Sequence, residues 1–241
     1  MLSTTQFLIF EIGSKCNLGC IHKKCPNSFR TPTGPHVLTD ELILQCIKEA
    51  YTVFNFTGLI GWHYYNEPML ESQRIFSLME RYPKARYVLW TNGCIQPDDS
   101  RINLFEQVYC TNYNNEVNAE YYKGCKSVSI FPPRFDERLM DTKNLRGNKR
   151  SCYKQHVEFI IDNWGTARLC CQDWRGEIKI GNLFEDNFAT LVLRRYEIIE
   201  QMKNGKLPPR CLKCRAKIGH LPKFDVNICR RTKKWLSKKN E

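Results

Sequence analysis

Short apolar runs alternate with amphipathic segments through the first half of this chain. The runs that predict strands cover residues 7–12, 58–65, 87–90, 108–111 and 127–131. Apolar residues recur at helical spacing after the predicted N-cap Thr39, before Pro83, and over residues 102–107. Because a helix between two strands returns the chain to the starting end of the sheet, this alternation predicts a parallel sheet, open or curled into part of a barrel.

The pattern changes after the two prolines at 132–133. Residues 134–150 are polar and charged, and they predict a connecting loop. Residues 157–161 and 166–170 flank a turn signal, so they predict two paired strands. One helix follows, and Asn204-Gly205 is typical of its C-terminal end.

Cysteine usage indicates both the compartment and the chemistry. The chain has 13 cysteines in 241 residues, an odd number. The longest apolar run near the start, residues 7–10, is too short for a secretory signal or a membrane span. We therefore expect a cytoplasmic, reducing compartment and no membrane partner, and a cysteine-rich chain in such a compartment usually binds metal.

Cys16, Cys20 and Cys25 form the first group of candidate ligands, on the loop after the first predicted strand. Three thiolates can hold three irons of a [4Fe–4S] cluster and leave the fourth iron open, which is typical of a reactive site. Taken alone, the group also allows a zinc site completed by His22 or by a distant residue, or three unrelated thiols.

Cys152, Cys170, Cys211 and Cys214 form the second group. The spacing of Cys211 and Cys214 is typical of metal binding, and the predicted hairpin could bring Cys152 and Cys170 together. Four thiolates fit a closed [4Fe–4S] cluster or a tetrahedral zinc site equally well. Cys171 is an alternative to its neighbour Cys170, although we interpret it, with the remaining cysteines, as a small and often buried hydrophobic residue: Cys46, Cys94, Cys110, Cys125, Cys171 and Cys229.

The formal net charge is +12, of which the last sixteen residues carry +5 and the remainder +7. Residues 226–241 hold six basic residues against one acidic residue, and no long basic block occurs elsewhere. A solvated terminal segment explains this tail, with an anionic partner as the alternative. Nucleic acid binding is therefore not favoured by charge alone.

Ordered motifs extend over most of residues 5–216. The first half contains Cys16-Asn17 with Cys20 and Cys25-Pro26-Asn27-Ser28, His63-Tyr64-Tyr65-Asn66-Glu67-Pro68, and Thr91-Asn92-Gly93. The second half contains Leu145-Arg146-Gly147, Ser151-Cys152, Leu169-Cys170 with Asp173, Ile180-Gly181-Asn182, and Cys211 with Cys214. Together they resemble the radical S-adenosylmethionine (SAM) enzymes that carry a shortened SPASM domain, the twitch variant.

This resemblance implies the fold class and the domains. It implies an α/β chain, with a partial (β/α) TIM-like radical SAM barrel over residues 1–133 and a connecting loop over 134–150. A small α+β twitch domain for the auxiliary cluster would follow over 151–225, and the basic tail would occupy 226–241.

The resemblance also implies ligands for two [4Fe–4S] clusters and for SAM. Cys16, Cys20 and Cys25 would hold the first cluster, and Cys152, Cys170, Cys211 and Cys214 the second. Glu67 and the backbone of Tyr65 and Asn66 would lie beside the SAM amino group. Further polar contacts to SAM would come from the ends of the next strands, although ordinary turn roles are an equal alternative there: Thr91, Asn92, Thr111 and Asn112.

The implied reaction is the oxidation of an alcohol to a ketone. SAM would be cleaved to a 5′-deoxyadenosyl radical that abstracts hydrogen from a carbinol carbon of a small polyol, amino sugar or aminocyclitol. The auxiliary cluster would accept the remaining electron, and a flavodoxin or ferredoxin would supply electrons from outside. Arg146 would orient the substrate oxygen, and His63 would face either the substrate or the core.

Two positions depart from the family pattern. Four residues instead of two separate Cys20 from Cys25, with Lys23 and Lys24 as the insertion and His22 where an aromatic residue is common. A longer loop costs little closure entropy, so the cluster can still form. Asn66 replaces a glycine, and because asparagine tolerates a positive φ we expect the turn to be kept.

Three alternatives remain. A sugar epimerase would need a hydrogen donor on the opposite face of the substrate, for which Cys171 or Cys94 is available. A peptide-modifying enzyme that makes thioethers or epimers is less favoured, since only fifteen residues precede Cys16 and leave no room for a leader-binding domain. A zinc-binding nucleic-acid module would make the motifs around Cys16 and Glu67 coincidental.

Overall fold

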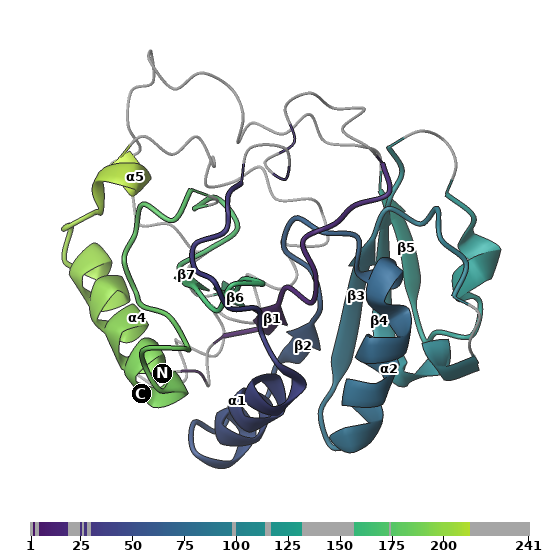
Figure 1. Ribbon diagram of the computed structural model, residues 1–241, viewed down its shortest axis with the longest axis horizontal. Coiled ribbons are helices and arrows are strands. Elements are labelled where there is room, and N and C mark those ends of the chain that lie inside the picture. Colours follow the sequence, from purple (N-terminus) through teal and green to yellow (C-terminus); the bar gives the residue numbers. More distant parts are fainter. Residues whose placement is uncertain are drawn as a thin grey trace, which may run out of the picture.

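The computed structural model describes residues 2, 5–18, 25, 27, 30–97, 100–113, 117–131, 157–173 and 175–212. At its centre lies a seven-stranded sheet with the order β5-β4-β3-β2-β1-β6-β7 (Figure 1). All neighbouring strands run parallel except β6 and β7, so the predicted parallel sheet is confirmed. The strands are β1 (Phe7–Phe10), β2 (Leu59–Gly61), β3 (Tyr87–Thr91), β4 (Phe105–Thr111), β5 (Val128–Phe131), β6 (Glu158–Ile161) and β7 (Ala167–Arg168).

The helices begin and end at the signals found in the sequence. Thr39 caps the first helix, because its hydroxyl accepts a hydrogen bond from the Leu42 N–H at 3.3 Å. The last long helix ends at Asn204, and Gly205 takes a φ of 80° there. The helices are α1 (Asp40–Thr52), α2 (Ser72–Arg81), α4 (Phe188–Lys203) and α5 (Pro209–Leu212), with 3₁₀ turns η2 (Pro68–Glu71), η3 (Ser100–Leu104) and η4 (Ala119–Tyr122).

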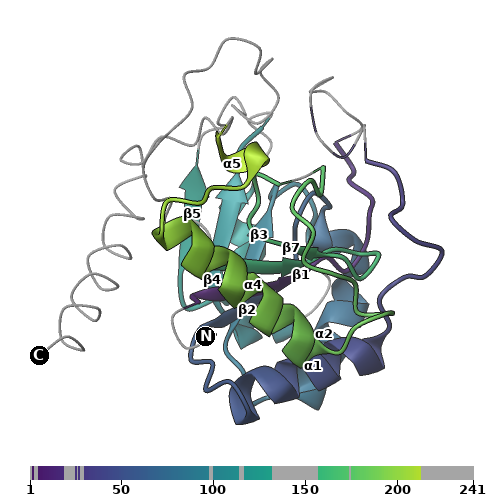
Figure 2. The same cartoon turned by 90° about the vertical axis from the view of Figure 1, so that its left-hand side faces the viewer.

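The two faces of the sheet carry different residues. The larger core packs one face against α1, α2 and α4, and Figure 2 shows α4 lying alongside the strands. On the other face a smaller cluster is rich in aromatic rings, and its buried members come from the strands and from the turn after β2. We call this second surface the inner face.

Two sequence predictions about local structure were wrong. Residues 102–107 are not a helix, because η3 ends at Leu104 and β4 starts at Phe105. Phe105 is fully buried and pairs in parallel register with Tyr87. Pairing with β3 therefore determines the secondary structure of this segment, which is too short for hydrophobic periodicity to assign. The strand predicted over 58–65 ends at Gly61, and a turn rich in buried aromatic residues follows it.

The predicted hairpin in the second half is confirmed as β6 and β7, with Ile161 opposite Ala167. Its first strand pairs in parallel with β1, so one continuous sheet joins the two halves of the chain. The division into a barrel and a twitch domain stays a prediction. The connecting loop at 134–150 and the tail at 226–241 lie outside the described residues.

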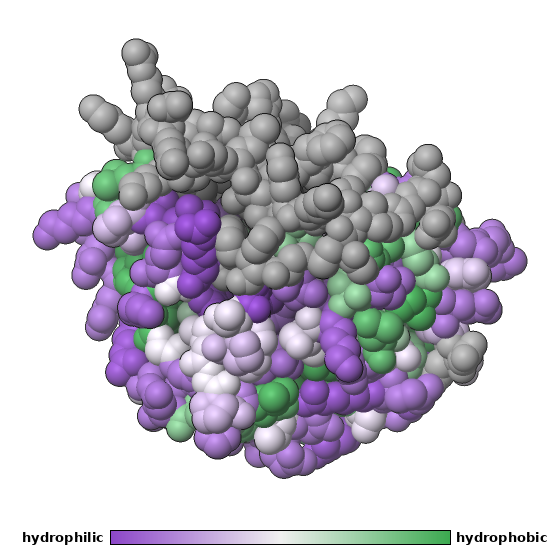
Figure 3. All heavy atoms as spheres, turned by 45° about the horizontal axis from the view of Figure 1, so that its top comes forward, coloured by the Kyte–Doolittle hydropathy of each residue, from purple (hydrophilic) through white to green (hydrophobic). Residues whose placement is uncertain are grey.

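Polar side chains dominate the described part of the surface in Figure 3, with hydrophobic residues in smaller groups between them. Within the described residues, no helix combines the length and the apolar character that a membrane crossing needs.

The core can be tested at Ile60, which is fully buried at the centre of β2. We expect Ile60→Ala to lower the free energy of unfolding by about 2–5 kcal/mol, because it removes buried methyl groups and leaves a cavity. Leu193→Ala on α4 is the matched control, since Leu193 is 47% exposed and should change stability by less than about 0.5 kcal/mol. Urea unfolding would measure both variants, and equal effects would contradict this description of the core.

Candidate functional site

Three loops meet at the carboxyl ends of β1, β2 and β3, where parallel sheets usually carry their sites. Cys16 and Asn17 follow β1, Glu67 follows β2, and Thr91 ends β3. A backbone hydrogen bond from the Glu67 N–H to the Lys15 carbonyl, 2.8 Å long, joins the first two loops directly. The motifs that were separate in the sequence therefore form one region.

Glu67 connects the second loop to the third. Its Oε1 accepts hydrogen bonds from the Thr91 hydroxyl at 2.7 Å and the Met69 N–H at 3.1 Å, and its Oε2 accepts from the Asn92 N–H at 2.7 Å. The residue is only 2% exposed, and burial raises the pKa of its carboxyl above the ordinary value although these hydrogen bonds oppose the shift. Glu67 thus fixes the positions of Thr91 and Asn92.

Asn92 extends these contacts to the cysteine loop. Its Nδ2 donates to Asn17 Oδ1 at 2.6 Å and lies 4.0 Å from the Cys16 sulfur. Burial is the main cause that raises the pKa of the Cys16 thiol, and the charges of Glu67 and of the Cys25 thiolate add to it. Cys16 and Cys25 are therefore electrostatic neighbours. Thiols are the ligands that iron–sulfur clusters use, so the donor chemistry of this loop is compatible with such a cluster.

Tyr65 and Asn66 lie in the turn between β2 and Glu67. The Tyr65 N–H donates to Glu11 Oε1 at 3.0 Å, and its hydroxyl donates to the Cys171 carbonyl at 2.5 Å. Asn66 does not use the positive φ that we expected, since Asn55 is the only non-glycine residue with positive φ in the described part of the chain. Instead, Asn66 Oδ1 accepts the Tyr64 N–H at 3.1 Å, and this side-chain bond closes the turn.

Thr111 and Asn112 lie at the end of β4, one strand beyond Thr91. The Asn112 N–H donates to the Phe131 carbonyl at 2.8 Å, which continues the pairing toward β5. The structure thus places Thr111 and Asn112 on the same edge of the sheet as Glu67. Their contact with SAM stays a prediction.

The second cysteine group is described in part. Cys170 is buried just after β7, and Cys211 is half-buried in α5. Arg210 Nη2 donates to the Gln172 carbonyl at 3.2 Å, so α5 is tied to the loop that follows Cys170. Four predicted site residues fall outside the described positions: Cys20, Arg146, Cys152 and Cys214. In the part of the chain that the structure describes, no three potential metal ligands come together.

An aromatic surface covers the inner face of the sheet. Trp90 lies at its centre, with ring centroids 4.9 Å from Phe7, 4.8 Å from His63 and 5.4 Å from Tyr109. A Cβ atom on Gly61 would come within 2.8 Å of the Trp90 ring. Glycine at this position of β2 therefore leaves the space that the indole occupies. His63 is therefore stacked on this surface, and such rings can pack against the flat faces of sugars or bases.

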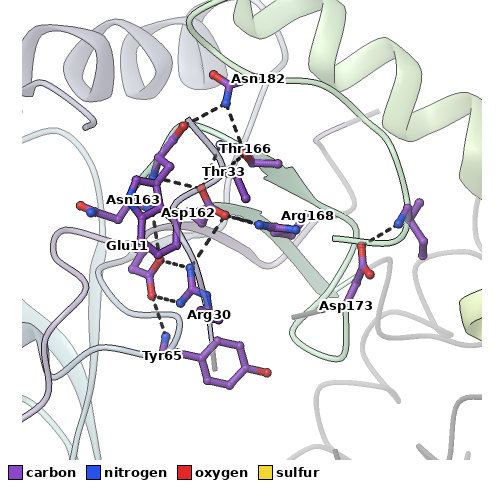
Figure 4. A network of polar contacts seen from close by, with 12 residues as sticks. Glu11, Arg30, Thr33, Tyr65, Asp162, Asn163, Thr166, Arg168, Asp173 and Asn182 are labelled. Atoms are coloured by element: carbon purple, nitrogen blue, oxygen red, sulfur yellow. Dashed lines mark hydrogen bonds and ion pairs between the residues drawn. The ribbon is translucent and has the colours of Figure 1, made fainter. Parts of the chain in front are cut away.

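A buried charge network was missed by the sequence reading (Figure 4). Arg30 donates to both oxygens of the Glu11 carboxylate, at 2.5 and 2.7 Å. The same carboxylate accepts the N–H groups of Tyr65 and Asn163, each at 3.0 Å. Burial alone would lower the pKa of Arg30, but the hydrogen bonds and charge of Glu11 outweigh it and raise the pKa above the ordinary value.

Asp162 and Arg168 complete this network. Asp162 Oδ2 lies 3.8 Å from Arg30 and accepts two hydrogen bonds from Arg168, at 2.9 and 2.5 Å. All four side chains are at most 3% exposed, and their two positive charges balance two negative ones. The available sequence signal was an acidic residue, Glu11, at the end of an apolar strand and next to the cysteine loop.

Comparison with known proteins agrees with this arrangement in part. No family model matches the chain. The curated S-adenosyl-L-methionine-dependent 2-deoxy-scyllo-inosamine dehydrogenase of Niallia circulans is 35% identical over 88 residues, which are 34% of this chain and 33% of that protein. The match thus spans about a third of the length of this relative.

Two solved structures share the fold along most of the chain. The crystal structure of BtrN in complex with AdoMet and 2-DOIA gives a TM-score of 0.62 at 19% identity and covers 83% of this chain and 88% of that one. SeMet BtrN in an open conformation gives a TM-score of 0.61 at 19% identity, with coverage of 88% and 92%. The mixed α/β fold with a mostly parallel sheet is therefore similar to that of BtrN.

The Glu67 contacts generate a test that needs no cofactor. In Glu67→Gln, an amide NH₂ replaces one accepting oxygen and faces a donor, so we expect a loss of about 1–3 kcal/mol of stability. Hydrogen exchange at the Asn92 amide should become faster. Glu120→Gln is the control, because the Glu120 side chain is 73% exposed. Unchanged exchange at Asn92 in Glu67→Gln would contradict the proposed loop contact.

Proposed function

We propose that this chain is a radical SAM oxidoreductase that oxidises an alcohol of an aminocyclitol or a similar small sugar to a ketone. The observation that carries the proposal is that Asn92, whose N–H is held by Glu67 at 2.7 Å, lies 4.0 Å from the Cys16 sulfur at the carboxyl edge of a parallel sheet. The fold shared with BtrN, which was solved with AdoMet and 2-DOIA, supports a partial barrel built for the same cofactor. The dehydrogenase that matches a third of the chain supports the reaction class.

The proposed cofactors are two [4Fe–4S] clusters and SAM. When bound, one cluster with SAM supplies an acceptor for a hydrogen atom, and the second cluster supplies an acceptor for one electron. Cys16, Cys20 and Cys25 are the proposed ligands of the first cluster, and the second would be held by Cys152, Cys170, Cys211 and Cys214. Glu67 would keep the third loop against the cysteine loop.

The residues of the chain must hold and orient the alcohol. Oxidation to a ketone removes two electrons and two protons, so the hydroxyl proton must leave in addition to the hydrogen atom on carbon. Arg146 is proposed to donate a hydrogen bond to the substrate oxygen, because a guanidinium stays protonated and serves poorly as a base. The aromatic surface around Trp90 would pack against the apolar face of the ring and exclude water.

A second candidate reaction, epimerisation, is favoured by the position of Cys171. This half-buried residue packs against the inner-face cluster, and its backbone N–H donates to Glu158 at 3.0 Å. An epimerase must return a hydrogen atom to the opposite face of the substrate, and a thiol at this place is a suitable donor. Cys94, the other candidate, lies instead in the loop after β3.

Metal and sulfide analysis tests the cofactor assignment. After anaerobic reconstitution we expect about eight irons and eight sulfides per chain, and 5′-deoxyadenosine should form from SAM under reduction. Cys16→Ala should lose about four irons and the cleavage of SAM. Cys46→Ala is the matched control, since Cys46 is buried in the larger core. Zinc without labile sulfide would show that the radical mechanism is wrong.

Product analysis separates the two reactions. When the protein is incubated with an aminocyclitol, SAM and a reductant, we expect a ketone as the product. One 5′-deoxyadenosine should form for each ketone. Cys171→Ala should leave the yield of ketone unchanged. If the wild type instead forms an epimer, and Cys171→Ala stops epimer formation, the second candidate is correct. Deuterium from solvent in the product would identify the thiol as the donor.

A further inference from the structure

We propose that Glu11 and Arg30 form a clasp that positions the loop of the first cysteine group, and that Asp162 links this clasp to the second half of the chain. The inference rests on the proposed function, because it assigns a role toward the first cluster. Neither residue belongs to a motif that suggested the function. Both are positioning residues, since they act through the loop and not on the substrate.

The clasp closes the loop at its base. Glu11 follows the last residue of β1, and Arg30 lies 19 residues further along the chain. All three cysteines of the first group lie between them. The pair therefore fixes both ends of the segment, whereas β1 alone would fix one end. A shorter effective loop has fewer conformations to lose when a cluster binds, and this matters more because the segment is longer than usual.

Glu11 also holds the neighbouring loops at fixed places. Its carboxylate receives the Tyr65 N–H from the loop after β2 and the Asn163 N–H from the turn between β6 and β7. The cysteine loop, the proposed SAM loop and the hairpin thus share one carboxylate. A substitution of Glu11 should therefore move the first cluster relative to SAM. The loss of a contact that only stabilises the fold would not cause this movement.

Arg30 is held in a geometry that lysine cannot reproduce. It makes two parallel hydrogen bonds to Glu11, and its guanidinium carbon lies 4.9 Å from the ring centroids of both Tyr64 and Trp164. Bidentate pairing and stacking on rings both need a planar guanidinium. Arg30→Lys should therefore keep the charge but lose the positioning.

Asp162 carries the connection toward the second cysteine group. It lies 3.8 Å from Arg30 and pairs with Arg168, the last residue of β7. Cys170 follows two residues later. One buried network therefore reaches from the base of the first cysteine loop to the strand that precedes Cys170, and it fixes the distance between the two proposed clusters.

The test uses Glu11→Gln/Arg30→Met, which removes both charges together and leaves no uncompensated buried charge from this pair. The parent and all variants carry Cys214→Ala, so that the bound iron is that of the first cysteine group. The matched control is Arg86→Met/Glu106→Gln, another bidentate pair, at 2.9 and 2.8 Å, between the residue that precedes β3 and a residue of β4, with the Arg86 side chain 54% exposed. Arg30→Lys is tested alone. The measurements are the rate of iron loss to a chelator, the EPR spectrum of the reduced cluster with SAM, and the melting temperature.

We expect the double variant and Arg30→Lys to lose iron about 10-fold to 100-fold faster than the parent, as when outer partners of metal ligands are removed. Their EPR spectra should respond differently to SAM, and the surface control should match the parent. If the variants lose iron at the rate of the parent and give the same EPR spectra, the inference is overturned while the proposed function stays intact. A lower melting temperature with unchanged iron loss and spectra would also overturn it. A parent chain without any iron–sulfur cluster would overturn both.

Discussion

The carboxylate of Glu11 receives four N–H groups in a place that water does not reach. A buried charge of this kind is costly unless every lone pair finds a donor, so the surrounding segments must come together for the fold to be stable. Two of the donors belong to Arg30 and the other two to backbone groups far apart in sequence. The arrangement of the loops above the sheet depends on this one group.

The sheet and the loops have different roles: the sheet carries the core, and the loops carry the polar groups at its carboxyl edge. Helices cover one face and bury the larger core, while the inner face keeps aromatic rings such as Trp90 and Tyr109. The carboxyl ends of the strands then bring Glu67 and Asn92 within hydrogen-bonding distance of each other and of the cysteine loop. A scaffold of strands that holds polar groups from several loops at fixed positions is well suited to carrying a functional site.

Local features of the sequence were the most informative. The Thr39 cap and the alternation of strands and helices depend on nearby residues, so pattern alone predicted them. The gathering of Cys16, Glu67 and Asn92 followed from the predicted parallel topology. The prediction of a helix over 102–107 was wrong, since β4 starts at Phe105, because a short apolar segment fits a helix or a strand. The contact of Glu11 with Asn163 spans 152 residues, and no local pattern reports a pairing of that kind.

The place of β1 between β2 and β6 has a consequence for dissecting the molecule. A fragment that stops at Phe131 would leave β1 as a bare edge strand, with apolar residues and unpaired backbone groups along its length. Such an edge readily recruits strands from other molecules and leads to aggregation. The second half of the chain therefore acts as a built-in cover for the first, and the two halves should be expressed as one polypeptide.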